Sequence, residues 1–290
     1  MINIKISLMS FMKAIYGELF NKKIPLIRRF KRIFARFNLS NVFIFFIKFF
    51  GRNNEIKTSP TIFKKLNHSK AIQNLKEHGI FDELFLPENE TNQILEFCKI
   101  TKFNFNRDEN YKINFSERLN QKNLYIMNIN NPHLNCETIN KITHDQQIIH
   151  LIRDYFGINP LIDSTQIFWS IPCFDNNGNI IKPPNNEFGY HYDIDGFKFL
   201  KLFFYLTDVN NDKDGSHVFI KKNKQNKQFI KSIHRRVSDD FVEQNYSDKI
   251  FKVIGKKGKG FLEDTSNYHK GNFPYNERGI LSIVYNISNW

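Results

Sequence analysis

The sequence predicts a mainly β fold with flanking helices, in the form of a sandwich or a barrel. Beyond residue 160, short apolar runs rich in Phe, Ile, Val and Tyr alternate with turns of Asn, Asp, Gly and Lys. This is the pattern of many short strands. Before residue 160, apolar residues recur at helical spacing instead. With 290 residues, of which 41% are hydrophobic, the chain can bury a large core.

The basic residues are concentrated in an N-terminal arm. Residues 1–60 hold 12 Lys+Arg and 2 Asp+Glu, whereas the remainder holds 30 and 27. The nearly balanced remainder gives no reason to expect a nucleic-acid partner. We therefore divide the chain into an arm and linker, residues 1–60, and a domain, residues 61–290.

A basic amphipathic helix is predicted inside the arm, after Pro25. Apolar residues recur there every three or four positions, and basic residues fill the opposite face. The apolar set is Leu26, Ile27, Phe30, Ile33, Phe34 and Phe37, and the basic set is Arg28, Arg29, Lys31, Arg32 and Arg36. One interpretation is peripheral contact of residues 25–50 with an anionic membrane. The other is a helix packed on the domain, with its charges in water.

Cysteine usage and hydropathy indicate the compartment. Cys98, Cys136 and Cys173 are far apart and form no Cys-x-x-Cys pair, which argues against structural zinc and a disulfide scaffold. No apolar run approaches the roughly 18–20 residues of a membrane span. The N-terminus lacks a clean apolar stretch followed by a small-residue cleavage site. We expect a cytoplasmic protein with a peripheral membrane contact as the alternative.

The elements follow in order along the domain. Helical spacing covers residues 61–78, 90–99 and 144–156, and residues 81–86 form a short strand. The later strands are predicted at 166–171, 199–207, 217–220, 249–254, 260–263 and 279–287. Residues 101–142 are polar and rich in Asn, and they receive no assignment.

The sharpest chemical signal is the sequence His191-Tyr192-Asp193. Residues i and i+2 of an extended chain point to the same face, so an imidazole and a carboxylate share one space. Two His and one carboxylate form the facial triad of non-haem Fe(II) oxygenases, which leaves positions open for a co-substrate and O2. A third ligand is required, and it should be a His on a distant strand. Asp195 lies on the same face and is an alternative carboxylate.

His269 is the preferred third ligand among the nine histidines. It lies 78 positions after His191, behind the strand at 260–263 and before a turn. Arg278 follows nine positions later, at the head of the last strand, where a guanidinium can bind a carboxylate with two hydrogen bonds. The simpler alternative is that His191 and Asp193 form a surface hydrogen-bonded pair and that Arg278 makes a salt bridge.

Several stretches resemble the phytanoyl-CoA dioxygenase family. They are 188–193 (FGYHYD), 199–209 (FLKLFFYLTDV), 214–220 (DGSHVFI) and 267–271 (NYHKG), with Arg278 at the position of the family's 2-oxoglutarate arginine. The resemblance covers roughly residues 70–290. It implies a double-stranded β-helix (a cupin-like jelly roll), Fe(II) held by His191, Asp193 and His269, and 2-oxoglutarate bound through Arg278.

The sequence departs from the family's pattern in one place. The family often has Pro-Gly-Ser-His-Lys where residues 220–224 read IKKNK, a difference that bears on substrate contacts. Asp193 is retained, whereas the halogenases of the family replace it with a small residue. Val284 stands where nucleic-acid demethylases of the wider superfamily carry a second arginine.

We therefore expect an Fe(II)- and 2-oxoglutarate-dependent dioxygenase that uses O2 to hydroxylate a small-molecule or lipid-like substrate. Phe168, Trp169, Phe203 and Tyr205 would form apolar walls or plain core. His217 would be structural, and Ser282 and Thr265 could reach the co-substrate. The alternatives are a non-catalytic jelly-roll binding protein and a peripheral membrane protein anchored by the basic arm.

Overall fold

A computed structural model describes residues 56–175, 188–222 and 235–288, with scattered positions between 16 and 47 and between 177 and 183. Its strands form one eight-stranded sheet in the order β1-β9-β6-β11-β5-β4-β2-β3 and one three-stranded sheet in the order β10-β7-β8. Every pairing between these strands is antiparallel. The predicted mainly β fold is confirmed.

The large sheet is built from β1 (Ile80–Phe85), β2 (Lys102–Phe105), β3 (Asp108–Asn114), β4 (Ile126–Asn130), β5 (Leu161–Ser170), β6 (Phe199–Tyr205), β9 (Lys259–Glu263) and β11 (Arg278–Asn286), and the small one from β7 (His217–Ile220), β8 (Ile250–Val253) and β10 (His269–Gly271). The α-helices are α4 (His68–Glu77), α5 (Glu88–Ile100), α6 (Glu137–Thr143), α7 (Gln146–Phe156) and α8 (Asp239–Tyr246). Short 3-10 turns η1 to η4 span Phe115–Asn120, Pro132–Leu134, Asp212–Asp214 and Ser247–Lys249.

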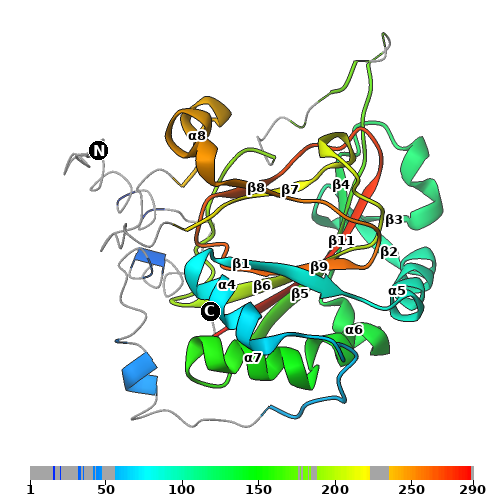
Figure 1. Cartoon of the computed structure of the whole chain (residues 1–290). Helices are drawn as coiled ribbons and strands as arrows, with labels where there is room; N and C mark the ends of the chain where they lie inside the picture. The colour runs from blue at the N-terminus through cyan, green and yellow to red at the C-terminus, as the bar shows by residue number, and fades with distance from the viewer. Residues whose placement is uncertain are drawn as a thin grey trace.

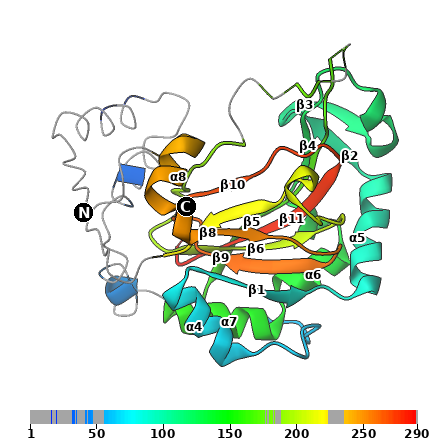
Figure 2. The ribbon, with the colours of Figure 1, turned by 45° about the horizontal axis from the view of Figure 1, so that its top comes forward.

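The strand order is that of a double-stranded β-helix. From β5 onward the chain alternates between the sheets: β5, β6, β9 and β11 lie in the large sheet, and β7, β8 and β10 in the small one. A bridge between His191 and His269 adds the segment around residue 191 beside β10. Figure 1 shows β7 and β8 facing the large sheet, and Figure 2 also labels β10. The jelly-roll prediction is therefore confirmed by the topology.

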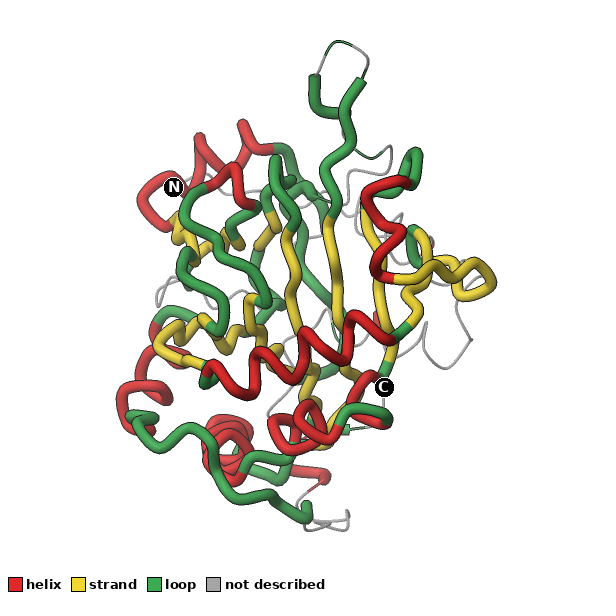
Figure 3. The backbone as a smooth tube through the Cα atoms, turned by 90° about the vertical axis from the view of Figure 1, so that its right-hand side faces the viewer, coloured by secondary structure: helices red, strands yellow, loops and turns green. Residues whose placement is uncertain are grey.

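Strand β6 is apolar on both faces because both are covered. Leu202 and Phe204 belong to the main core with the helices, whereas Phe203 and Tyr205 belong to a second cluster between the sheets. Figure 1 shows α4, α6 and α7 along the outer face of the large sheet, and in Figure 3 a long helix crosses the view in front of the strands. Burial on both faces explains why this strand reads as an apolar run that only Lys201 interrupts.

The start of the first helix and the unassigned segment are where the structure adds most to the prediction. Helix α4 begins at His68, because the Asn67 side chain accepts from the Lys70 N–H and caps it; the predicted start at residue 61 was wrong. Residues 61–62 instead bind the buried Asp145 carboxylate, which also caps α7. Residues 101–142, which had no assignment, contain β2, β3, β4 and nearly all of α6.

Most of the basic arm lies outside the described residues, so the division at residue 60 stays a prediction. Ile44 is buried with the main core, and Ala35 is buried beside Tyr192 and Ile194. These two positions pack on the domain. Among the described residues, no helix has the length and apolar character needed to cross a membrane.

Replacing Phe204 should test the helix-side core. Phe204 is completely buried and stacks on Phe63 with ring centroids 5.6 Å apart. We expect Phe204→Ala to lower the free energy of unfolding by about 3–5 kcal/mol, because it removes buried surface and leaves a cavity. Urea denaturation measures this change. Ile100→Ala, at a side chain that is 85% exposed, should stay within about 0.5 kcal/mol of the wild type; equal losses in both variants would contradict the packing described here.

Candidate metal centre

The structure brings His191, Asp193 and His269 together. One ligand atom from each residue lies within 4.8 Å of the others. The Asp193 carboxylate is 3.9 Å from His191 Nε2 and 3.4 Å from His269 Nε2. Backbone pairing fixes this convergence: His191 and His269 exchange N–H···O bonds of 2.9 and 2.8 Å, and Asp193 N–H donates to the Thr265 carbonyl. Segments 78 residues apart are thus held side by side by their main chains.

Both histidines present the same nitrogen to the cluster. His191 Nδ1 lies 2.9 Å from the Gly189 carbonyl, and His269 Nδ1 lies 2.9 Å from the Asn267 carbonyl. A carbonyl oxygen only accepts, so each Nδ1 carries the proton. Each Nε2 is left with its lone pair facing the shared space, which is how metal-binding histidines are commonly held.

The electrostatics of the three groups suit a cation. Burial, together with His269, lowers the pKa of His191 to about 3, so its imidazole is neutral at physiological pH. Burial would also lower the pKa of His269, but Asp193 outweighs it and raises that pKa. Burial would raise the pKa of Asp193, but Lys201 and His269 hold it well below the ordinary value, so the group is a carboxylate.

Asp195, the alternative carboxylate, is turned to a different partner. Its side chain lies 2.7 Å from Lys201 Nζ, and it is not part of the metal-ligand cluster. Lys201 also donates to Asp193 at 2.8 Å. Asp193 as the ligand stays a prediction, and this geometry supports it over Asp195.

Arg278 is buried without an acidic partner among the described residues. Its Nη1 donates to the Gly215 carbonyl at 2.6 Å, its Nη2 lies 3.3 Å from Ser170 Oγ, and its Nε has no partner. Burial lowers its pKa. The expected simple salt bridge is therefore not what holds Arg278. A Cβ at Gly271 would lie 2.8 Å from Nη1, so the guanidinium packs directly against the β10 backbone.

Only some of the residues predicted to form apolar walls lie between the two sheets. Phe203 and Tyr205 lie between the sheets, and Phe168 packs against them. Trp169 does not: it belongs to the helix-side core, and its Nε1–H donates to Glu277. Ser282 and Thr265 are buried, and Thr265 Oγ1 has no hydrogen-bond partner. Trp169 is therefore plain core, which is one of the two roles expected for it.

Three polar residues near the cluster were not anticipated in these roles. His217 stacks on His269 with ring centroids 5.7 Å apart and bonds the fully buried Glu263 at 2.9 Å. Glu263 Oε1 has no partner. Lys201 stands directly opposite Glu263 in the β6–β9 pairing. Charged residues inside otherwise apolar strands, as at 201 and 263, were the signal that could have revealed them.

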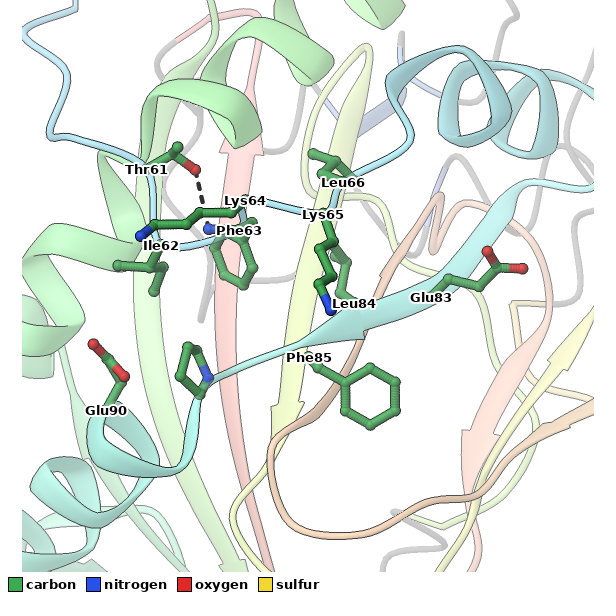
Figure 4. Close-up of a pocket in the computed structure, with 11 residues that line it drawn as sticks. Thr61, Ile62, Phe63, Lys64, Lys65, Leu66, Glu83, Leu84, Phe85 and Glu90 are labelled. Atoms are coloured by element: carbon green, nitrogen blue, oxygen red, sulfur yellow. Dashed lines mark hydrogen bonds between the residues drawn. The ribbon is translucent and has the colours of Figure 1, made fainter.

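A separate groove of about 550 Å³ lies between residues 61–66 and strand β1. Figure 4 shows its lining, in which the Phe63 N–H donates to Thr61 Oγ1. None of the predicted site residues lines it. The groove is therefore unrelated to the metal cluster.

Comparisons with known proteins give remote structural likenesses. No family model and no curated protein matches the sequence. The 2-oxoglutarate-dependent epimerase SnoN of nogalamycin biosynthesis is 13% identical, with a TM-score of 0.49 over 75% of this chain and 80% of its own. HygX of Streptomyces hygroscopicus, crystallised with nickel, 2-oxoglutarate and hygromycin B, is 10% identical, with a TM-score of 0.49 over 74% and 86%. The carbocyclase SnoK is 15% identical, with a TM-score of 0.47 over 78% and 86%. At such low similarity, the assignment of the site depends on its own side chains.

Metal titration should test the cluster. We expect the wild type to bind one Co(II) or Fe(II) per chain under anaerobic conditions, followed by calorimetry or Co(II) absorption. His269→Ala removes one of three protein ligands and should weaken binding by more than the ~10–100-fold that loss of an outer partner costs. Asp195→Asn should still bind the cation, because Asp195 lies outside the cluster. Equal binding by wild type and His269→Ala would eliminate this site.

Proposed function

We propose that this chain is an Fe(II)- and 2-oxoglutarate-dependent dioxygenase related to the phytanoyl-CoA dioxygenase family. His191, Asp193 and His269 would hold Fe(II), since two imidazoles and one carboxylate are the donor set of this enzyme class. The prepared Nε2 atoms and the ionised Asp193 support this choice. When bound, iron and 2-oxoglutarate supply the activation of O2 that ends in succinate, CO2 and a hydroxylated substrate.

The buried Arg278 is the observation that carries the proposal. A guanidinium without an acidic partner is costly in a protein interior, and an anion that completes it repays that cost. Arg278 packs on Gly271, which is two residues along β10 from His269 and on the same side of the strand. Two residues of strand span about 7 Å, which suits a dicarboxylate held by the metal at one end and by Arg278 at the other.

The remaining residues would orient and shield these groups. Ser170 and Gly215 fix the guanidinium from two sides. The apolar cluster around Phe203, Tyr205 and Phe261 keeps the interior between the sheets dry, and a dry site strengthens each electrostatic contact within it. We propose a small-molecule or lipid-like substrate.

Arg278→Ala should weaken the binding of 2-oxoglutarate. Breaking a buried charge pair of this kind costs about 2–4 kcal/mol, which is roughly a 30- to 700-fold higher Kd. Anaerobic titration of the Fe(II)-loaded protein, followed by its visible charge-transfer band, measures this Kd. Fe(II) affinity should change little, since Arg278 is not in the ligand cluster.

Gly271→Ala is the matched variant, because the new methyl group would occupy the space of the Arg278 guanidinium. It should also raise the Kd for 2-oxoglutarate while Arg278 remains present. An unchanged Kd in both variants would refute the role of Arg278, even if the metal binds.

We also propose the membrane contact of residues 25–50 as an additional property. Among the described arm residues, Val42, Phe45 and Phe46 are large, apolar and about half exposed or more, and the arm around them is basic. Exposed aromatic side chains beside basic residues favour the surface of an anionic bilayer.

Replacing both exposed phenylalanines should separate anchoring from catalysis. We expect Phe45→Ser/Phe46→Ser to reduce co-sedimentation with phosphatidylserine vesicles and to leave 2-oxoglutarate turnover unchanged, since Ile44 and Ala35 still pack on the domain. Neutral phosphatidylcholine vesicles serve as the control. Wild-type protein that binds neither vesicle would favour the arm as a packed element only.

A further inference from the structure

Lys201 is a buried cation inside the metal centre that the ligand set itself does not require. Its side chain is 16% exposed, and its Nζ lies 2.8 Å from Asp193 and 2.7 Å from Asp195. The neighbouring residues of β6, Leu200 and Leu202, are fully buried and apolar. Burying an ammonium group in such a strand is unfavourable unless carboxylates pair with it. The pairing of Lys201 with the two carboxylates therefore matters for the positions in which it holds them.

Asp195 is held in turn by the last strand. The Asn286 side chain, on β11, donates to the Asp195 carbonyl at 2.6 Å. A Cβ at Gly196 would lie 2.3 Å from Asn286 Oδ1, so the main chain passes this side chain closely. Lys201 thus forms one ion pair with Asp195, whose backbone is held by β11, and a second ion pair with Asp193.

Lys201 binds one oxygen of Asp193, Oδ2, which also lies 3.4 Å from His269 Nε2. Arg235 approaches the other oxygen only to 3.7 Å, and His191 Nε2 lies 3.9 Å from that same oxygen. The carboxylate is therefore fixed through one oxygen while the other, Oδ1, faces the first histidine without a close hydrogen bond. Both oxygens of a carboxylate have lone pairs, so Oδ2 can accept from Lys201 while Oδ1 keeps its lone pairs for another partner.

We propose that Lys201 is a positioning residue for the metal centre: its ammonium group, backed by Asp195, fixes the orientation in which Asp193 meets the cation. This inference rests on the proposed metal site. Lys201 would not touch the metal, the co-substrate or the substrate.

A role through charge alone and a role in positioning Asp193 predict opposite changes in metal affinity when Lys201 is removed. If Lys201 acted only as a nearby positive charge, its removal would strengthen the binding of a divalent cation, because like charges repel. If it positions Asp193, its removal weakens binding, as loss of an outer partner of a metal ligand typically does by ~10–100-fold. Metal affinity therefore separates the two roles in sign.

The test compares Lys201→Met with Lys201→Gln in the full chain, using Co(II) titration by calorimetry and absorption. Methionine keeps the volume and loses both charge and donor, whereas glutamine loses the charge and keeps an N–H donor for Asp193. We expect the Co(II) Kd to rise ~10–100-fold in Lys201→Met and by less in Lys201→Gln. Lys259→Met is the control, since Lys259 is 12% exposed and pairs with Asp82 away from the cluster; its Kd should equal the wild-type value.

Circular dichroism verifies that each variant is folded before titration. If Lys201→Met binds Co(II) as tightly as the wild type or more tightly, the inference is overturned. The proposed metal site still stands in that case, provided that the wild type binds Co(II). If Lys201→Met does not fold, Lys201→Gln decides alone, and unchanged or tighter binding overturns the inference. Absence of Co(II) binding by the wild type overturns both.

Discussion

The site depends on one short piece of antiparallel pairing, in which His191 and His269 exchange backbone hydrogen bonds. The two residues are neighbours across adjacent segments of the small sheet, although they lie far apart in the sequence. The pairing sets the spacing of the imidazoles, and their own backbone carbonyl partners set the tautomers. The geometry of the cluster is therefore a property of main-chain pairing first and of side-chain choice second.

The interior between the sheets contains more charge than an ordinary β core. Asp193, Lys201, Glu263 and Arg278 are all largely buried there, and His217 connects Glu263 to the stacked His269. Two of these groups have an atom without a partner, Glu263 Oε1 and Arg278 Nε. Unsatisfied buried polar atoms are rare in folded proteins and are typical of sites that bind something. Both of these atoms lie in the interior between the sheets, where the proposed metal and anion sites are.

Much of this arrangement followed from the residues. Strands such as 217–220 and 260–263 were correctly predicted because their apolar runs end at clear turn residues. Residues 101–142 received no assignment, in part because β3 is an exposed, polar edge strand whose pattern does not differ from a loop. His269 was selected by its spacing and its surroundings, and the structure brings it into the cluster.

The roles of Lys201 and Glu263 could not be predicted, because they depend on which residues face each other across β6 and β9. Periodicity gives the face of a strand but not its partner or register. Periodicity could not decide between wall and core for Trp169 for a related reason, since the inward and outward faces of β5 are both covered and both read as apolar.

Strand β11 lies between β5 and β6 in the large sheet, although it is the last of the described strands to leave the ribosome. It contributes Arg278 at one end and Asn286 at the other. Until it inserts, β5 and β6 have no shared neighbour, and a nascent chain has neither the guanidinium nor the anchor of Asp195. Insertion of a central strand demands long-range contacts, which form slowly. A partly synthesised chain would already contain His191, Asp193 and His269 but not Arg278, so the proposed anion contact would be completed only in the final step of folding.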